Sequence, residues 1–158
     1  EAECDFLVVD TSGGLQRFVR QLLAAADCVL VVTTPEPTAI ANAYATIKTL
    51  GNNASPRVEL VVNRVDGARQ ARAILDRLRR TTNVFLEGDI EAAGWIPEDP
   101  HVAAAVADRL PLALDAPDSP AARAIQQIAR RLFYQHQSHS DRGTFFERFW
   151  HCRLPQAA

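Results

Sequence analysis

The amino-acid sequence predicts an α/β protein built on a doubly wound, mostly parallel sheet. The first observation is a set of short apolar runs rich in β-branched residues, at residues 6–9, 28–32 and 58–62, the last interrupted by Glu59. Continuous rather than alternating apolar runs are typical of parallel strands that helices cover on both faces. The second observation is that a helical pattern of apolar residues follows each run. Such alternation of strand and helix favours right-handed crossovers and a parallel sheet.

The other elements continue this alternation along the chain. A fourth strand is predicted at residues 92–96, where Pro97 ends it. Residues 111–120 begin and end with proline and predict a loop that could hold a short edge strand. Pro120 suits the first turn of a helix, because the N–H that it lacks would be unpaired there. The predicted helices cover residues 15–23, 40–50, 68–80, 101–110 and 120–135.

Composition limits the classes of function. The chain has 158 residues, of which 47% are hydrophobic and 23% are charged, as in a globular domain that buries a core. Its net charge of −2 provides no global attraction to nucleic acid. Three widely spaced cysteines without a CxxC pair indicate reduced thiols and a cytoplasmic protein. No apolar stretch approaches the roughly 20 residues of a membrane-spanning helix.

The first strand end carries candidate chemistry, since open α/β sheets bind ligands at the carboxyl ends of their strands. The run at residues 6–9 is followed by Asp10, Thr11 and then Ser12-Gly13-Gly14. An acid at this place can hold Mg²⁺ directly or through water, and paired glycines let backbone N–H groups approach a phosphate. The same five residues would also form a good turn and helix cap, so both interpretations stand at this point.

Later strand ends could hold the base of a nucleotide. The third run ends in Asn63 and Arg64. A side-chain amide can recognise a purine edge with its paired donor and acceptor, although an Asn in a loop is common. The segments Thr33-Thr34-Pro35-Glu36 and Pro97-Glu98-Asp99 follow two other strands. Taken alone, each of these two segments predicts no more than a turn.

Taken in order, the strand ends resemble the MinD/ParA family of deviant P-loop ATPases. The resemblance covers residues 5–132 and depends on four collinear motifs. They are Asp5-Phe6-Leu7-Val8-Val9-Asp10-Thr11 with Gly14, Val32-Thr33-Thr34-Pro35-Glu36-Pro37-Thr38, Val61-Val62-Asn63-Arg64-Val65 and Gly94-Trp95-Ile96-Pro97-Glu98-Asp99. The residues that follow Glu36 look most like the MinD-like regulators of flagellar number and placement. The resemblance implies a P-loop NTPase-like sheet whose N-terminal strands are missing from this chain.

The resemblance also implies a role for each strand end. Asp10 would be the Walker B acid that holds the Mg²⁺ shell, through water, and the residues after it would sense the γ-phosphate. Asn63 would contact the adenine base, and Pro97 would line the base pocket through backbone groups. The implied catalytic residues are Asp10 and Gly14, and the implied contacts to ATP or ADP are Thr11, Asn63, Arg64 and Pro97.

Two features depart from the family pattern. Asn42 stands where many relatives carry an acid, which puts in doubt a charged contact on the dimer face near Thr38. The Gly-rich phosphate loop with its lysines, and the switch I acid, have no counterpart in these residues. The sequence begins with Glu1 and contains no Met, so we interpret it as a fragment of a longer protein. We expect the fragment alone to bind ATP poorly and not to hydrolyse it, whereas the parent would be an ATPase.

The end of the chain predicts a separate amphipathic helix. We divide the chain into a nucleotide-binding part (1–134), a linker (135–143) and a tail (144–158). Bulky apolar side chains recur four residues apart in the tail, with basic residues beside them, as in a helix that lies in a membrane interface. A helix docked on the protein itself, or on a dimer partner, would show the same stripe, so both alternatives stay open. The candidate membrane-binding residues are Phe145, Phe146, Phe149, Trp150 and Leu154.

Three functions are compatible with these observations. The first is a MinD-like positioning regulator that forms a homodimer on binding ATP and attaches to the inner membrane surface through paired tails. A regulatory protein partner would trigger its release, and it would govern flagellar number and placement or division-site placement. The second is a ParA-like DNA-partitioning ATPase, which the acidic net charge and the aromatic tail disfavour. The third is a non-catalytic, partner-binding module with the same sheet.

Overall fold

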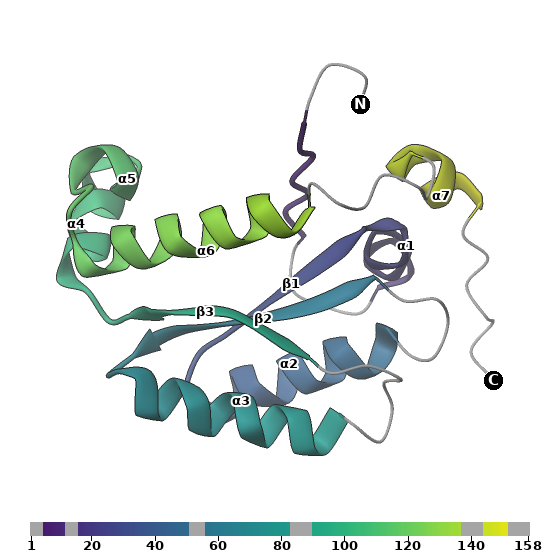
Figure 1. Ribbon diagram of the computed structural model, residues 1–158, viewed down its shortest axis with the longest axis horizontal. Helices are drawn as coiled ribbons and strands as arrows, with labels where there is room; N and C mark the ends of the chain where they lie inside the picture. Colours follow the sequence, from purple (N-terminus) through teal and green to yellow (C-terminus); the bar gives the residue numbers. More distant parts are fainter. Residues whose placement is uncertain (1–4, 12–15, 51–55, 83–89, 137–143, 152–158) are drawn as a thin grey trace.

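The computed structural model describes residues 5–11, 16–50, 56–82, 90–136 and 144–151. A sheet of three parallel strands with helices on both faces forms its centre, which confirms the predicted fold class (Figure 1). In chain order the elements are α1 (Arg17–Ala25), β1 (Cys28–Thr33), α2 (Pro37–Leu50), β2 (Arg57–Val65), α3 (Ala68–Thr82), β3 (Glu91–Pro97), α4 (Pro100–Asp108), α5 (Leu112–Asp115), α6 (Pro120–His136) and α7 (Phe145–His151).

The strands are ordered β1-β2-β3, so each pairs with its neighbour in the sequence. Val31 lies opposite Leu60, and Val62 lies opposite Trp95, in the two parallel ladders. The carboxyl ends of all three strands therefore meet at one edge of the sheet. The central strand β2 is buried on both faces from Val58 to Val62, as its largely apolar run predicts, and the interrupting Glu59 is buried too.

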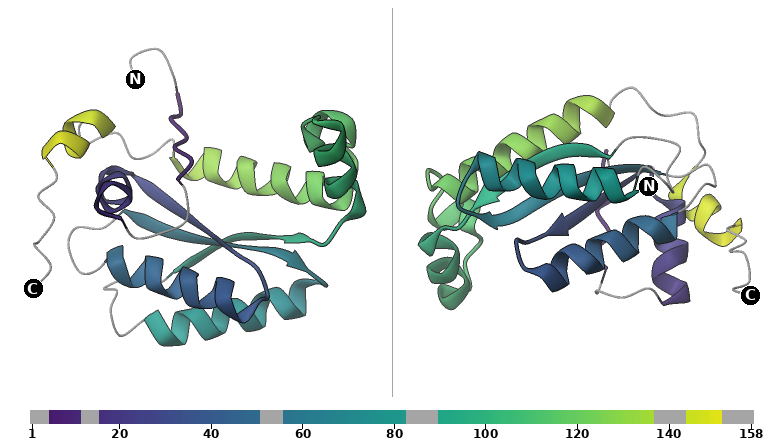
Figure 2. Two further views of the ribbon diagram at one scale, coloured as in Figure 1. Left: turned by 180° about the vertical axis from the view of Figure 1, so that it is seen from behind. Right: turned by 90° about the horizontal axis from the view of Figure 1, so that it is seen from below.

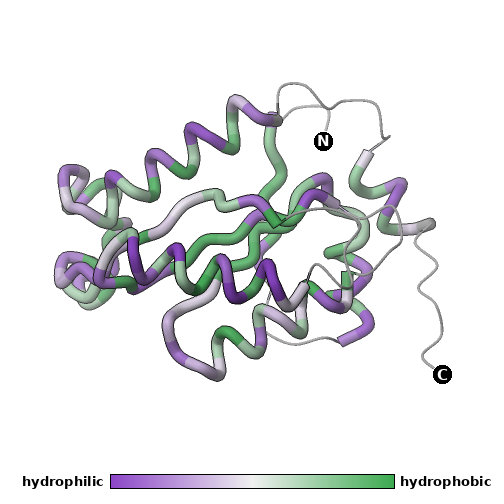
Figure 3. The backbone as a smooth tube through the Cα atoms, turned by 60° about the horizontal axis from the view of Figure 1, so that its bottom comes forward, coloured by the Kyte–Doolittle hydropathy of each residue, from purple (hydrophilic) through white to green (hydrophobic). Residues whose placement is uncertain are grey.

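Two layers of helices cover the sheet. Helices α2 and α3 lie on one face and α6 lies on the other (Figure 2). The larger core is between the sheet and the α2–α3 layer, where Ile47, Leu60, Leu78 and Ile90 are at most 1% exposed. Figure 3 shows this organisation as hydrophobic strands flanked by helices in which hydrophobic and hydrophilic residues alternate.

Helix α6 lies close to β3 because Gly94 has no side chain. A Cβ at Gly94 would stand 2.6 Å from Cγ1 of Ile128 and 3.1 Å from its Cδ1. Ile128 is buried with Val61 and Ala93 in a second, smaller core on this face. The glycine therefore sets how near α6 comes to the strand whose end carries Pro97.

One carboxylate is fully buried in the sheet. Glu59 of β2 lies 3.0 Å from Nη2 of Arg57 and 3.7 Å from Nε of Arg131 on α6. Arg131 also pairs with Glu91 of β3 at 3.0 Å. Because a buried charge is stable only when it is paired, these contacts fix the C-terminal half of α6 on the sheet. Burial next to this carboxylate raises the pKa of the Cys28 thiol, which agrees with an unreactive, reduced cysteine.

The prediction of a first strand at residues 6–9 is wrong. This run is exposed and makes no strand, and the ring of Phe6 packs 5.5 Å from that of Phe133 on α6. A run of strand-forming residues needs a neighbouring strand to complete its hydrogen bonds, and none of the three described strands pairs with it. On β1, Leu30 and Val32 are 41% and 56% exposed, so this strand is covered on only one face.

Two other boundaries differ from the sequence prediction. Between the two prolines at 111 and 120 lies the short helix α5 rather than an edge strand, and the N–H groups of Leu114 and Asp115 donate to the Pro111 carbonyl. Helix α6 continues to His136, so the first two residues of the predicted linker are helical. Among the described helices, none is long and apolar enough to cross a bilayer.

Candidate functional site at the carboxyl edge of the sheet

A single arginine joins the loops that follow all three strands. Arg64, at the end of β2, places Nε 2.8 Å from Oε2 of Glu98, which follows β3. Its Nη1 lies 3.7 Å from Oε1 of Glu36, which follows β1. The three loops meet because the strands are parallel, at the edge where α2 and α3 begin (Figure 1). Ligands of open α/β sheets bind at such an edge.

The backbone of this arginine is unusual. Arg64 has a φ of 58°, in the left-handed region that residues with a Cβ rarely adopt. Oδ1 of Asn63 accepts the Arg64 N–H at 2.9 Å, and the Glu98 N–H donates to the Val65 carbonyl at 3.1 Å. Such conformations persist where surrounding contacts hold them, and they cluster at functional sites. The Asn63 side chain is thereby oriented, with its amide N–H groups and one oxygen lone pair available to a ligand.

The edge is acidic. The hydroxyl of Thr34 donates to the Glu36 carboxylate, and this hydrogen bond, with the nearby Arg64 charge, lowers the pKa of Glu36. Glu98 and Asp66 add further carboxylates, whereas the one described cation among these loops, Arg64, is already paired with two of the acids. This balance suits an uncharged, polar ring better than a phosphate.

A second acid fixes the loop after β3. Asp99 is 6% exposed and begins α4, where its Oδ1 accepts the His101 N–H at 3.0 Å and contacts Nδ1 of His101 at 2.8 Å. Its Oδ2 accepts the N–H of Ala121 at 2.9 Å, in the first turn of α6. The Ala121 hydrogen bond, followed by those from His101, lowers the pKa of Asp99. One carboxylate thus caps two helices and positions the neighbouring Pro97.

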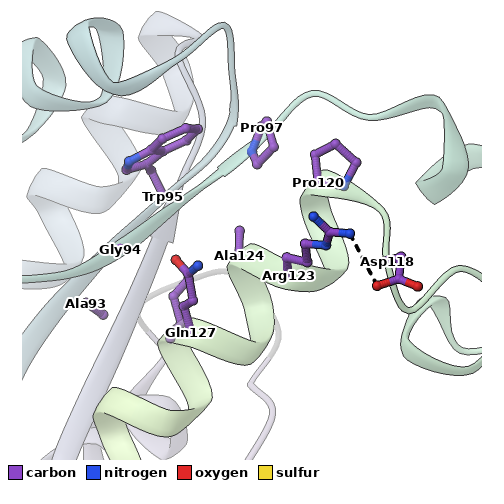
Figure 4. Close-up of a pocket in the computed structure, with 10 residues that line it drawn as sticks. Ala93, Gly94, Trp95, Pro97, Asp118, Pro120, Arg123, Ala124 and Gln127 are labelled. Carbon is purple, nitrogen blue, oxygen red and sulfur yellow. Dashed lines mark hydrogen bonds and ion pairs between the residues drawn. The ribbon is translucent and has the colours of Figure 1, made fainter.

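A pocket of about 440 Å³ opens beside Pro97, between β3 and α6 (Figure 4). Pro97 and Pro120 supply apolar walls, while Arg123 and Gln127 supply polar groups from α6; the ring of Trp95 projects from the other side of β3. Arg123 pairs with Asp118 at 3.3 Å, as the dashed line in Figure 4 shows. Apolar walls with a few polar groups are typical of small-molecule sites.

The structure brings together only some of the predicted site residues. Asn63, Arg64 and Pro97 lie at the carboxyl edge. Asp10 and Thr11 belong to the exposed segment 5–11, which runs beside the C-terminal half of α6, away from that edge (Figure 1). Gly14 lies outside the described residues. A carboxylate such as Asp10 is the ligand type that Mg²⁺ prefers, and Mg²⁺ often takes one protein carboxylate plus waters and phosphates. Within the described residues, no three His, Cys, Asp or Glu side chains cluster around a metal position.

The predicted tail helix forms as α7. The Thr144 N–H donates to Glu147, and the Glu147 N–H donates to the Thr144 hydroxyl, which is a capping box. Trp150 and Phe146 are 78% and 50% exposed, whereas Phe145 and Phe149 are partly buried. Leu154 lies outside the described residues. Part of the aromatic stripe therefore docks on the protein and part faces solvent.

Sequence reasoning missed the ion pairs of Arg64 and the double role of Asp99. The Asp99-Pro100 pair was a signal for the start of α4, because an acid followed by proline is a common helix beginning. The bond from Asp99 to Ala121 and the pairing of Arg64 with Glu36 and Glu98 have no local signal. They depend on loops that meet only when the sheet forms.

Sequence comparison finds curated relatives over most of this chain. The flagellum site-determining protein YlxH of Helicobacter pylori is 34% identical over 126 residues, covering 79% of this chain and 42% of that protein. An ATP-binding protein of Methanocaldococcus jannaschii is 30% identical, covering 92% and 53%. The antiactivator FleN of Pseudomonas aeruginosa is 33% identical, covering 81% and 46%. No protein-family model matches the chain.

Solved structures of MinD proteins share the fold of this chain. The MinD cell division protein of Aquifex aeolicus superposes with a TM-score of 0.56 at 27% identity, covering 71% of this chain and 46% of that one. The MinC:MinD complex of the same organism gives 0.54 at 28% identity, covering 75% and 46%. The chain spans about half the length of the proteins that it matches. The predicted resemblance to MinD-like ATPases, with flagellar regulators among the relatives, is confirmed.

Proposed function

Since most of the chain matches about half the length of MinD/ParA-like ATPases, we propose that the whole protein is an ATP-binding positioning regulator. The observation that carries the proposal is the carboxyl edge, where Arg64 contacts the loops after β1 and β3 and where Asn63 and Pro97 end neighbouring strands. Flagellar number and placement is the process that we assign first. The flagellum site-determining relative supports this choice, since its identity of 34% exceeds the 27% of the MinD protein of Aquifex aeolicus.

The edge would hold the base and not the phosphates. Asn63 offers N–H donors and an acceptor that match the edge of adenine, and the pocket beside Pro97 offers apolar walls to a ring. The carboxylates of Glu36 and Glu98 would repel a triphosphate. The phosphates and Mg²⁺ would therefore be bound away from this edge, with Asp10 as the candidate acid for the metal's water shell. Mg²⁺ in such sites neutralises charge that develops on the phosphates.

Membrane attachment and pairing belong to the same proposal. ATP would favour a homodimer, and two α7 helices would bind a membrane surface more tightly than one. The exposed rings of Phe146 and Trp150 support a role in lipid contact. A regulatory protein partner would control release, in keeping with a relative named as an antiactivator and with a solved MinC:MinD complex. Attachment would be peripheral and reversible.

Nucleotide selectivity tests the role of the edge. In the protein expressed from the complete reading frame around these residues, Asn63→Ala removes the amide and Gln126→Ala removes an exposed amide on α6 as a control. Loss of one or two hydrogen bonds to adenine should weaken ATP binding by roughly three- to thirtyfold and reduce the preference for ATP over GTP. Titration with fluorescent ATP and GTP analogues measures both quantities. Unchanged affinity and preference in the Asn63→Ala variant would refute the assignment of the edge.

A further inference from the structure

Arg64 occupies a backbone position that arginine seldom takes. Its φ of 58° is in the left-handed region, which glycine adopts without strain and other residues adopt at a cost. The turn itself therefore does not require an arginine. What the arginine adds is a guanidinium group, whose Nε donates to Oε2 of Glu98 at 2.8 Å and whose Nη1 lies 3.7 Å from Oε1 of Glu36. The side chain, and not the backbone, accounts for an arginine at this position.

These two ion pairs matter more for the site than for the stability of the fold. The side chains of Arg64, Glu36 and Glu98 are 58%, 51% and 59% exposed. Ion pairs that water reaches are screened, and many of them contribute nothing measurable to stability. The consequence of the pairing is instead chemical, because it determines whether two carboxylates at the carboxyl edge are free to accept other hydrogen bonds.

The two purine bases differ in what they present to a carboxylate. A carboxylate can only accept hydrogen bonds. Guanine has N–H donors at the neighbouring positions N1 and N2, which match the two oxygens of one carboxylate. Adenine has a donor at N6 but an acceptor at N1, so a carboxylate that faces this edge meets a lone pair. A free carboxylate beside the base therefore favours guanine, whereas the amide of Asn63, with a donor and an acceptor, suits adenine.

We propose that Arg64 makes the base site selective for adenine over guanine, by occupying the carboxylates of Glu36 and Glu98 that would otherwise accept hydrogen bonds from guanine. Rejection of a competing ligand is as much a source of specificity as attraction of the correct one. Arg64 also donates its backbone N–H to Oδ1 of Asn63 at 2.9 Å, which orients the amide that suits adenine. Arg64 is thus a positioning residue, since it acts on the base through its neighbours. This inference rests on the proposed nucleotide-binding function and adds the determinant of base specificity.

Glu98 is the acid whose release should have the larger effect. Its backbone N–H donates to the carbonyl of Val65 at 3.1 Å, which holds it beside the end of β2. Its carboxylate is paired with Arg64, so the loss of Arg64 frees it. Glu36 also accepts a hydrogen bond from the hydroxyl of Thr34, the main cause of its lowered pKa, and it keeps this partner when Arg64 is absent. Removal of the Glu98 carboxylate should therefore offset most of the effect of removing Arg64.

The ratio of the association constants for ATP and GTP tests the proposal, because both nucleotides carry the same triphosphate. An effect of charge on the phosphates cancels in this ratio, and an effect on the base remains. Calorimetric titration with each nucleotide measures it in the protein expressed from the complete reading frame. The variants are Arg64→Gln, Arg64→Gly, which suits the left-handed backbone, the double variant Arg64→Gln/Glu98→Gln, and Asp66→Asn. Arg72→Gln on the exposed side of α3 is the control with the same loss of charge as Arg64→Gln.

We expect Arg64→Gln and Arg64→Gly to lower the ratio of ATP to GTP affinity about three- to tenfold, which is a charge-assisted hydrogen bond discounted for exposure to water. The double variant should recover most of the original ratio, and Arg72→Gln should leave it unchanged. If Arg64 only held the loops together, the double variant would not recover, because it lacks the same ion pairs. An unchanged ratio in both Arg64 variants, or no recovery in the double variant, therefore refutes the proposal.

Two further outcomes separate this inference from the proposed function. If Asp66→Asn raises the ratio while the Arg64 variants leave it unchanged, the acid that the base meets is Asp66, and the role given to Arg64 is wrong. If Asn63→Ala weakens ATP binding but no Arg64 variant changes the ratio, the base binds at this edge and the inference alone fails. If Asn63→Ala and the Arg64 variants all bind both nucleotides as the unaltered protein does, the base is not bound at this edge and both fail.

Discussion

A methyl group added at Gly94 should push α6 away from the sheet. The Cβ of Gly94→Ala would stand 2.6 Å from Cγ1 of Ile128 and 3.1 Å from Cδ1, both well inside the roughly 3.5–4.0 Å at which two carbon atoms attract. Cδ1 can move by rotation of the terminal bond of the side chain. Cγ1 cannot move without a change of χ1 or a shift of α6, so relief of this contact strains the smaller core.

The cost follows from these distances. Forcing an extra methyl group into a packed core costs about 1–3 kcal/mol. Replacement of a glycine within a strand raises the unfolding free energy by about 0.5–1 kcal/mol, because the unfolded chain loses conformational freedom. The net loss of unfolding free energy should therefore be about 1–2 kcal/mol. Ile128→Ala alone removes a buried side chain and should cost about 2–4 kcal/mol, and it also removes both atoms that clash with the new methyl.

Urea unfolding of the four proteins of this double-mutant cycle measures the prediction. The double variant should be no less stable than Ile128→Ala, because the methyl at position 94 then fills part of the cavity. The coupling between the two positions should reach about 1–3 kcal/mol. Simple additivity of the two losses, or a Gly94→Ala variant as stable as the unaltered chain, would refute the claim that Gly94 sets the position of α6.

Two further predictions concern buried carboxylates. Glu59→Gln should lower the unfolding free energy by about 1–3 kcal/mol, because it leaves Arg57 and Arg131 without their buried charged partner. Glu91→Gln is the control and should cost less than about 1 kcal/mol, since the Glu91 side chain is exposed. Urea unfolding of both variants measures the difference. Asp99 has a lowered pKa in the folded protein, so its stabilising effect is present above its ordinary value near 3.8 and is lost as the pH falls through the lowered one. At pH 7, Asp99→Asn should unfold at a lower temperature than the unaltered protein. Between pH 7 and a pH below 4, its unfolding temperature should fall by less than that of the unaltered protein. Asp118→Asn is the exposed control, and an unchanged unfolding temperature of Asp99→Asn at pH 7 would contradict this role.

The sequence predicted the central strands and helices because their signals are local and agree with one another. The β2 segment is an apolar run interrupted only by Glu59, and it is buried because helices cover both of its faces. α6 begins at Pro120 and ends within one residue of the predicted position. The run at 6–9 has the same composition as these strands but forms none. A strand needs a partner as well as a propensity, and no local pattern reports whether the partner is present.

The candidate site was predictable only in part, for the same reason. Asn63 and Pro97 could be placed at strand ends from the order of the apolar runs, and parallel pairing brings them to one edge. The charge balance of that edge depends on which side chains face one another across loops. Arg64 was predicted as a contact to the nucleotide, but the structure shows it paired with Glu36 and Glu98. The role of Arg64 is therefore better described as holding the loops around Asn63, and its direct contact with a nucleotide stays a prediction.

Different contacts stabilise the two ends of the sheet, and the difference indicates which end can change conformation more easily. At the carboxyl edge, Arg64 and Asp99 join three loops and two helices through hydrogen bonds and one longer ion pair, which favours a site that is formed before its ligand arrives. At the amino end, α1 is short and depends on Arg148 from α7. Elements that move in regulation are drawn from the least stable parts of a fold. The loops around Asn63 should therefore keep their shape when the contact between Arg148 and α1 is broken.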